Sequence, residues 1–226
     1  MIFLLVHSPL VGPSTWRPVA RELVRRGHGA LVPSLLGAAD APPPHWRHCV
    51  SAVREQVGKP RDPIVLVGHS GAGLLLPAIA DCVSATVSRL LFVDSGIPVR
   101  TGETPVVPQR FIDELATLAV GGRLPPWSKW WGEDAMSDLI PDEGQRDMLA
   151  AEMPSVSLDQ LRERIPSPAG WDRVPCGYLL LSDAYIDAAA EARERGWRVL
   201  HIIGAQHLHI VVAPEAVTDA LLRLAE

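Results

Sequence analysis

Cysteine and lysine are scarce in this chain of 226 residues, and the chain carries no net positive charge. The three cysteines, Cys49, Cys82 and Cys176, are odd in number and share no spacing typical of a metal site. We therefore expect reduced thiols and no metal centre. The formal net charge is −5, and the basic residues are scattered along the chain. This charge distribution disfavours a nucleic-acid partner.

Long hydrophobic runs are absent as well. The apolar N-terminal segment, residues 2–6, has no basic region and is too short for export or membrane insertion, so it predicts a strand. We accordingly expect a cytoplasmic protein with no membrane partner. Hydrophobic residues make up 47% of the chain and charged residues 21%, which is typical of a globular domain with a substantial core.

Short apolar runs alternate with stretches of helical spacing along the chain. Such alternation builds a mostly parallel sheet with helices on both faces, so the predicted class is α/β. A final helix begins near Pro214. The expected strands lie near Ile2–Val6, Ala30–Val32, Ile64–Val67, Leu90–Val93, Tyr178–Leu181 and Val199–Ile203.

The alternation stops in residues 98–174, where no segment has a convincing strand pattern. A stretch of this length is far beyond an ordinary connection. We therefore expect residues 1–97 and 175–226 to form the core, with residues 98–174 inserted as a helical lid. An insertion at this point lies above the carboxyl ends of the strands, where open α/β sheets bind ligands.

Three tryptophans in the insertion have two alternative roles. Trp127, Trp130 and Trp131 could line the roof of an apolar pocket, or each could pack the insertion onto the body. Trp130 is the candidate substrate-binding residue among them.

The clearest chemical signal is the segment Gly68-His69-Ser70-Gly71-Ala72, which follows an apolar strand. A Gly-x-Ser-x-small sequence after a strand holds a nucleophilic serine on a sharp, strained turn, and its small residues are what that geometry requires. The N–H of Gly71 faces the place where an oxyanion would form. The pattern predicts acyl transfer at Ser70, and the alternative is a plain turn without chemistry.

A general base is expected far downstream of this serine. His207 follows the last expected strand, on the same edge of the sheet as Ser70. An imidazole there can take the serine proton and return it to the leaving group. His209 is the competing candidate, and His201 lies inside the strand as a structural residue. A metal pair of His207 and His209 lacks a third ligand at a recognised spacing, so no metal or other cofactor is expected.

Together, His7-Ser8, residues 12–16, residues 68–73 and His207 resemble the α/β-hydrolase superfamily over essentially the whole body of the chain. The resemblance is to a small serine esterase-like member, with some similarity to the plant esterase and hydroxynitrile-lyase branch. It implies the chain order nucleophile, acid, histidine. It also implies a serine hydrolase without a cofactor, acting on an ester, thioester or amide of a small, largely apolar molecule.

Three positions depart from the pattern of that family. Pro9 stands where the second oxyanion N–H usually originates, and proline has none. The second donor is then the N–H of Leu10, the hydroxyl of Ser8 or a bound water. Ala72 replaces the second glycine of the turn, a mild change. Pro77 is expected to kink the helix after the nucleophile.

The acid of the family normally follows the strand Tyr178–Leu181 by a few residues. Asp183 lies slightly before the usual position and Asp187 slightly after it, while Tyr185 falls nearest. Of these residues, Asp183 is the first candidate to orient the histidine.

Asp94, which ends the strand Leu90–Val93, is the second candidate acid. Some family members take their acid from that strand. Its alternative role is a carboxylate that caps or braces a loop.

Two other classes of function stay open. One uses Ser70, His207 and the Ser8 hydroxyl for acid–base chemistry without an acyl-enzyme, as in a lyase, dehydratase or cyclase. The other is a non-catalytic ligand-binding protein. A small molecule is the expected partner in each case, and a homodimer is an open alternative for the assembly.

Overall fold

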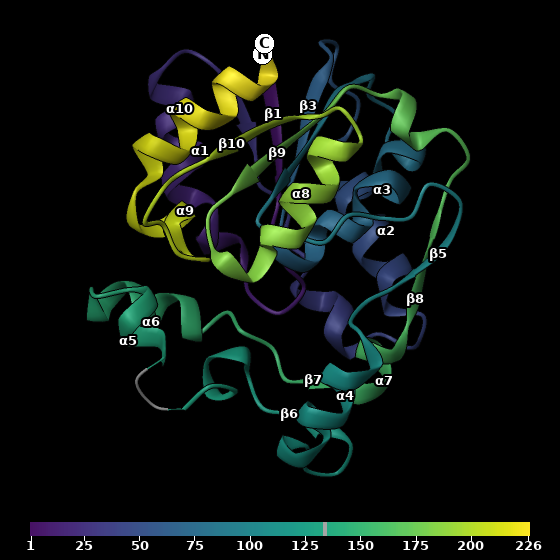
Figure 1. Cartoon of the computed structure of the whole chain (residues 1–226), viewed down its shortest axis with the longest axis vertical. Coiled ribbons are helices and arrows are strands. Elements are labelled where there is room, and N and C mark those ends of the chain that lie inside the picture. The colour runs from purple at the N-terminus through teal and green to yellow at the C-terminus, as the bar shows by residue number, and fades with distance from the viewer. Residues whose placement is uncertain (133–134) are drawn as a thin grey trace.

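The computed structural model describes residues 1–132 and 135–226. Its centre is a six-stranded sheet in the order β10-β9-β4-β3-β1-β2, and every neighbouring pair in it is parallel. The predicted α/β class is therefore confirmed (Figure 1). The strands are β1 (Ile2–Val6), β2 (Gly29–Leu31), β3 (Ile64–His69), β4 (Val87–Val93), β9 (Cys176–Leu180) and β10 (Arg198–His201).

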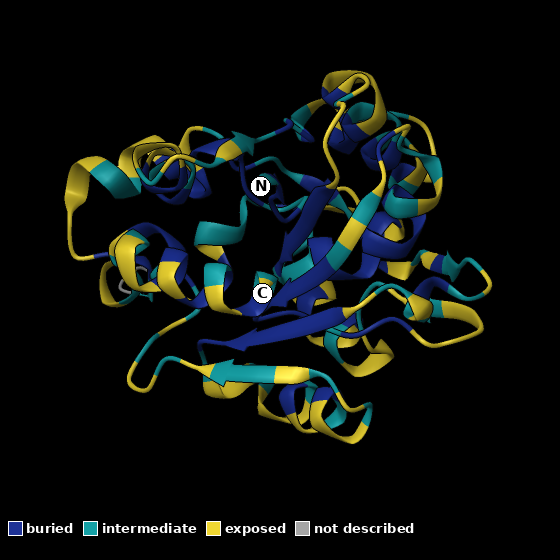
Figure 2. Cartoon of the chain, turned by 90° about the horizontal axis from the view of Figure 1, so that it is seen from above, coloured by how far each residue is buried: buried dark blue, intermediate teal, exposed yellow. Residues whose placement is uncertain are grey.

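Helices cover both faces of this sheet, as Figure 1 shows. One face carries α1 (Arg17–Arg25), α9 (His209–Val212) and α10 (Pro214–Ala225), and the other carries α2 (His45–Val57), α3 (Leu76–Cys82) and α8 (Ile186–Glu194). Seen from above in Figure 2, the central strands are largely buried, and the exposed residues lie mainly on the helices, the loops and the edge strands.

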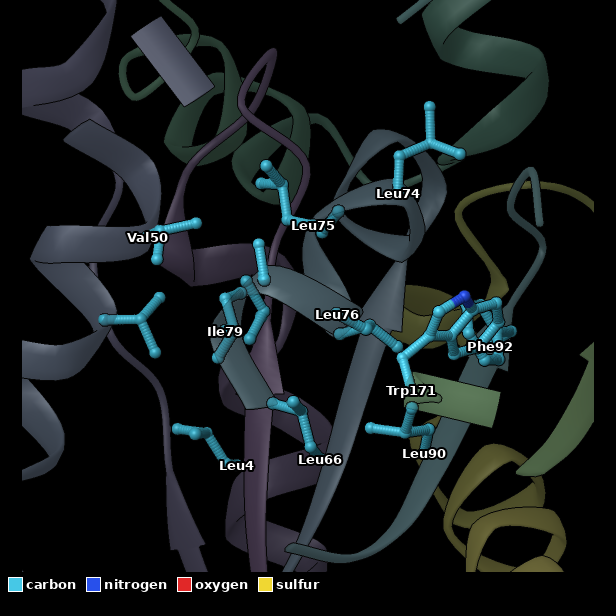
Figure 3. Packing of buried hydrophobic residues seen from close by; sticks show 14 of the residues in the cluster. Leu4, Val50, Leu66, Leu74, Leu75, Leu76, Ile79, Leu90, Phe92 and Trp171 are labelled. Carbon is cyan, nitrogen blue, oxygen red and sulfur yellow. The ribbon is translucent and has the colours of Figure 1, made fainter. Parts of the chain in front are cut away.

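Alternation along the strands divides the core into two buried clusters. In β1, Leu4 packs on the side of α2 and α3, while Phe3 and Leu5 pack on the side of α1 and α10. This is the two-residue period expected of a strand whose faces are both covered. Figure 3 shows Leu4 and Leu66 from neighbouring strands beside Ile79 of α3.

The turn after β3 differs from the expectation of a kinked helix. Residues Ser70–Leu75 form a 3-10 helix, and α3 begins only at Leu76. Pro77 therefore lies in the first turn of α3. The N–H groups of a first turn have no acceptor within the helix, so a proline there costs no hydrogen bond. It starts a helix instead of bending one.

The described part of residues 109–162 lies at the end of the sheet away from the two termini, as Figure 1 shows. The expectation that residues 98–174 lack strands is wrong, because β5 pairs with β8 and β6 with β7, both antiparallel. These strands are two to four residues long, too short for an alternating pattern. The elements are β5 (Gly102–Pro105), α4 (Gln109–Leu115), β6 (Arg123–Leu124), α5 (Ala135–Leu139), α6 (Glu143–Ala150), β7 (Val156–Ser157), α7 (Leu158–Arg162) and β8 (Arg164–Ser167).

Short 3-10 helices complete the described chain, and they are Pro13–Thr15, Leu36–Asp40, Ala116–Leu118, Trp127–Lys129, Trp171–Arg173 and Asp183–Tyr185. No helix within residues 1–132 or 135–226 is long and apolar enough to cross a membrane.

Candidate active site

Ser70 lies at the carboxyl end of β3 in a strained backbone conformation, with a φ of 56°. The residues around Ser70 have to be small because larger side chains would clash with the surrounding structure. A Cβ on Gly68 would lie 2.8 Å from Leu76 Cδ2, and a Cβ on Gly73 would lie 2.3 Å from the Ser95 hydroxyl oxygen. The methyl group of Ala72 is fully buried in the apolar cluster. The sharp turn that the sequence predicts is therefore present.

The loop after β1 is a tight turn that places Ser8 beside the nucleophile. Val11 N–H donates to the Ser8 carbonyl at 3.1 Å, which suits Pro9 at the second position of the turn. The buried His7 donates from Nδ1 to the same carbonyl at 2.8 Å and accepts from Leu35 N–H at 3.0 Å. Burial lowers the pKa of His7 to about 4, so it acts here as a neutral brace.

Pro9 has no N–H, so the hydrogen-bond donors near Ser70 come from other groups. Leu10 N–H donates to the Ser8 hydroxyl oxygen at 3.3 Å, so this donor is already used within the loop. The Ser8 hydroxyl keeps its own hydrogen to donate elsewhere. A Cβ on Gly71 would lie 3.3 Å from that hydroxyl oxygen, so Gly71 and Ser8 are neighbours. The Ser8 hydroxyl and the Gly71 N–H therefore lie close together beside Ser70.

His207 pairs with Asp94 at the carboxyl edge of the sheet. The imidazole Nδ1 donates to Asp94 Oδ2 at 2.7 Å. Oδ1 accepts from the N–H groups of Leu181 and Ser182 at 2.9 and 2.8 Å, and the Ser182 hydroxyl donates to Oδ2 at 2.5 Å. Burial alone would raise the pKa of Asp94, but the hydrogen bonds and the charge of His207 outweigh it and hold the pKa below its ordinary value.

The sequence analysis places Asp183 before Asp94 as the candidate acid, but in the structure the carboxylate bonded to His207 is that of Asp94. Asp183 and Asp187 are both exposed, and within the described chain neither forms an ion pair or hydrogen bond with His207. The reason lies in two local features. Asp94 has a φ of 44°, a turn at the end of β4 that brings its carboxylate against Leu181, the residue after β9. The side chain of Ser182 already contacts that carboxylate.

Aromatic rings surround the imidazole of His207. The ring centroids of His69, Tyr185 and Trp127 lie 4.5, 5.4 and 6.2 Å from that of His207, and Tyr185 is stacked at 15°. Burial raises the pKa of the Tyr185 phenol, and hydrogen bonding with Ser70 offsets only part of that rise. Tyr185 is therefore a neutral phenol beside the nucleophile.

Ser70 and His207 line one small cavity of about 10 Å³. This is room for about one water molecule. No direct hydrogen bond joins the two side chains in the described structure, and catalytic hydrogen bonds are commonly long in unliganded enzymes. The remaining lining residues are Ser8, Leu10, Val11, His69, Trp127 and Leu208.

A larger cavity of about 500 Å³ also has His207 in its wall. Leu139 of α5 and the exposed residues Asp183, His201 and Ile203 line it as well. His201 ends β10, and His209 begins α9 outside the small cavity.

The three tryptophans of the insertion have different surroundings. Trp127 lines the small cavity. Trp130 is only 6% exposed, packs within the insertion and donates from Nε1 to the Pro125 carbonyl at 2.8 Å, so the candidate substrate-binding tryptophan is not in the cavity. Trp131 is half exposed and stacks on Phe111.

The sequence analysis assigns no role at this site to His69 or Ser182, and it does not predict that Tyr185 contacts His207. His69 adjoins the nucleophile and Ser182 ends the strand that normally precedes the acid, so both positions were visible in the sequence. Their contacts depend on loops that meet only in the folded chain.

Comparison with known proteins agrees with the fold. The family model described as "Alpha/beta hydrolase family" matches residues 3–220, and the chain belongs to this family. It is 24% identical over 127 residues to the carbendazim hydrolyzing esterase of Nocardioides sp., a match that covers 53% of this chain and 52% of that protein. It is 26% identical to methylesterase 8 of Arabidopsis thaliana, covering 99% of this chain and 89% of that protein.

A solved structure shares the whole fold. An extracellular α/β-hydrolase from a Paenibacillus species superposes with a TM-score of 0.75 at 15% identity, covering 99% of this chain and 98% of that chain. The relatives that match by sequence are both named as esterases, which supports a hydrolase.

Proposed function

We propose that this protein is a serine hydrolase that cleaves a carboxylic ester of a small, largely apolar molecule, with a thioester or amide as the related alternatives. The observation that carries the proposal is the cavity shared by Ser70 and His207, with the other nitrogen of His207 bound to the buried Asp94. Esterases among the relatives support the same class of reaction.

The reaction follows from the placement of these groups. Ser70 Oγ attacks the carbonyl carbon while His207 Nε2 takes its proton, and Asp94 stabilises the imidazolium. The oxyanion accepts hydrogen bonds from Gly71 N–H and the Ser8 hydroxyl. His207 then protonates the leaving oxygen, and a water attacks the acyl-enzyme by the reverse path. One such oxyanion donor contributes about 2.7–4 kcal/mol.

The lining of the cavity favours an apolar group on the substrate. Leu10, Val11, Trp127 and Leu208 supply most of the side chains around Ser70 that do not take part in chemistry. A volume of about 10 Å³ beside Ser70 is too small for a substrate, so Trp127, which lines it from the insertion, has to move for binding. In this proposal residues 98–174 act as a lid.

Labelling with a fluorophosphonate probe tests the proposal. Intact mass spectrometry followed by peptide mapping is expected to locate one adduct on Ser70, and Ser70→Ala is the control that takes none. A folded protein that hydrolyses aryl esters at an undiminished rate after Ser70→Ala would contradict it.

One observation favours acid–base chemistry without an acyl-enzyme as the second candidate. Ser70 and His207 line the same cavity, but no hydrogen bond joins their side chains in the described structure. Under that mechanism Ser70 acts as a hydrogen-bond donor only. Loss of all activity on Ser70→Ala without any adduct on Ser70, from the probe or from a substrate, would favour the second candidate.

A further inference from the structure

His69 immediately precedes the nucleophile in sequence and contacts the base in space. Its Nε2–H donates to the backbone carbonyl oxygen of His207 at 2.9 Å. This bond ties the end of β3 to the loop after β10, two segments 138 residues apart in the chain. His69, Ser70 and His207 all line the same cavity, so this bond lies next to both proposed catalytic residues.

We propose that His69 is a positioning residue, which sets the distance between Ser70 and His207 by holding the backbone of His207. The inference rests on the proposed function, because it assigns a task within that reaction. A hydrogen bond to the backbone fixes the loop without occupying either nitrogen of the His207 ring. Nδ1 of His207 stays with Asp94, and Nε2 stays free for proton transfer.

The ring of His69 is held on several sides. It is 1% exposed, lies 4.5 Å from the His207 ring at 33°, and makes an edge contact with Trp16 at 6.0 Å. Trp16 is itself fixed by a hydrogen bond from Nε1 to the Val6 carbonyl at 3.0 Å. Because this ring is fixed at the end of β3, its hydrogen bond holds the His207 carbonyl at a set distance from β3.

The other nitrogen of His69 is evidence that the residue is not there for stability alone. Because Nε2 donates to a carbonyl, Nδ1 carries a lone pair, and it is buried without a hydrogen-bond partner among the described residues. An unsatisfied buried polar atom costs free energy. An apolar side chain of similar size would avoid that cost but would lose the bond to His207.

Electrostatics also suit this role. Burial, and then the charge of His207, lower the pKa of His69 to about 3, so the ring stays neutral when His207 becomes an imidazolium. The titratable groups in contact with the His207 ring are the Asp94 carboxylate, the neutral His69 and the neutral Tyr185 phenol, and Asp183 and His201 share the larger cavity with it. His69 can therefore pack against the base without opposing its protonation.

Two substitutions separate the hydrogen bond from the packing. His69→Leu removes the N–H and keeps an apolar side chain, whereas His69→Gln places an amide N–H near the position of Nε2. His28→Leu is the matched control, because His28 also has an orphaned buried Nδ1 and an edge contact, with Phe3, at the opposite end of the sheet. Rates of aryl-ester hydrolysis and of Ser70 phosphonylation are measured for each.

We expect His69→Leu to lower kcat by about 10- to 100-fold, the loss typical of a misplaced catalytic group, with KM changed less than about threefold. Phosphonylation of Ser70 should slow in parallel. His69→Gln should recover most of both rates, and His28→Leu should change only the melting temperature. Should His69→Leu not fold, His69→Asn takes its place, because its amide is too short to reach the carbonyl.

Equal losses in His69→Leu and His69→Gln, or normal rates in both with a lower melting temperature, would overturn the inference. If the wild-type protein is labelled and every variant is labelled at the same rate, this inference alone fails. If the wild-type protein neither takes the probe nor hydrolyses esters, the proposed function fails and this inference with it.

Discussion

Asp94 Oδ2 lies 2.7 Å from Nδ1 of His207, although 113 residues separate the two in the chain. The pair joins the end of β4 to the loop after β10, across the intervening strand β9. Asp94 is fully buried, and three donors from Leu181 and Ser182 hold its carboxylate. An acid with this support is oriented before any substrate arrives.

Replacing Asp94, the acid in the proposed mechanism, should abolish most of the activity. Asp94→Asn keeps the shape of the side chain but removes the charge that stabilises the imidazolium, so we expect kcat to fall by about 10⁴-fold, as in the worked case of the serine proteases. Steady-state kinetics with an aryl ester measures the change. Asp183→Asn is the control and should stay within about threefold of wild type, because Asp183 is exposed. A larger loss at Asp183 than at Asp94 would reverse our assignment.

The position of Ser182 gives a second prediction about the acid. Its hydroxyl oxygen lies 2.5 Å from Asp94 Oδ2, so a carboxylate at position 182 can reach the same nitrogen of His207. We expect Asp94→Ser to be nearly inactive and the double variant Asp94→Ser/Ser182→Asp to recover at least about tenfold in kcat. Ser182→Asp alone should be impaired, because two buried carboxylates repel each other. No recovery in the double variant would show that only β4 can supply the acid.

Trp127 and Trp130 should behave differently on truncation. Trp127 lines the cavity, so Trp127→Ala should change the ratio of kcat/KM values across a panel of acyl groups by about 1–3 kcal/mol. Trp130 is buried within the insertion, so Trp130→Ala should leave these ratios unchanged and destabilise the protein by about 3–5 kcal/mol. Kinetics and thermal unfolding on the same samples decide between them. Unchanged ratios for both variants would remove Trp127 from the substrate site.

Buried neutral histidines predict how stability depends on pH. Burial lowers the pKa of His7 to about 4 and that of His69 to about 3, whereas both titrate near 6.5 in the unfolded chain. Unfolding therefore takes up protons below about pH 6.5, and stability falls as the pH drops from there towards the folded values. We expect the melting temperature to fall between pH 7 and pH 4.5.

His69→Gln should flatten that pH dependence, because glutamine does not titrate. His201→Gln is the control, because it makes the same exchange at an exposed histidine. An unaltered slope in His69→Gln would count against a neutral, buried His69.

The sheet could be predicted from the sequence because its strands are short apolar runs separated by helices, and the pattern of β3 running into Ser70 is local. The acid could not. Its identity depends on the backbone of Asp94 entering the left-handed region with a φ of 44°, and on Ser182 and Tyr185 meeting the site from another loop. Neither leaves a periodic signal in the sequence.

The short strands β5 to β8 were missed for a related reason. A strand of two residues, such as Arg123–Leu124, is too short to show alternation, and its pairing with Val156–Ser157 is set by the packing of the insertion. Trp130 was a candidate for the substrate site because tryptophan suits both a pocket and a core. Only its hydrogen bond to Pro125 and its burial distinguish the two.

The central claim is that Ser70 becomes acylated during turnover. Acid quenching of the protein during hydrolysis of a p-nitrophenyl ester, followed by intact mass spectrometry and peptide mapping, measures this directly. The account predicts a mass increase equal to the acyl group on the peptide that contains Ser70, and no such increase in Ser70→Ala. Continued turnover in Ser70→Ala, without any acyl adduct in either protein, would contradict it.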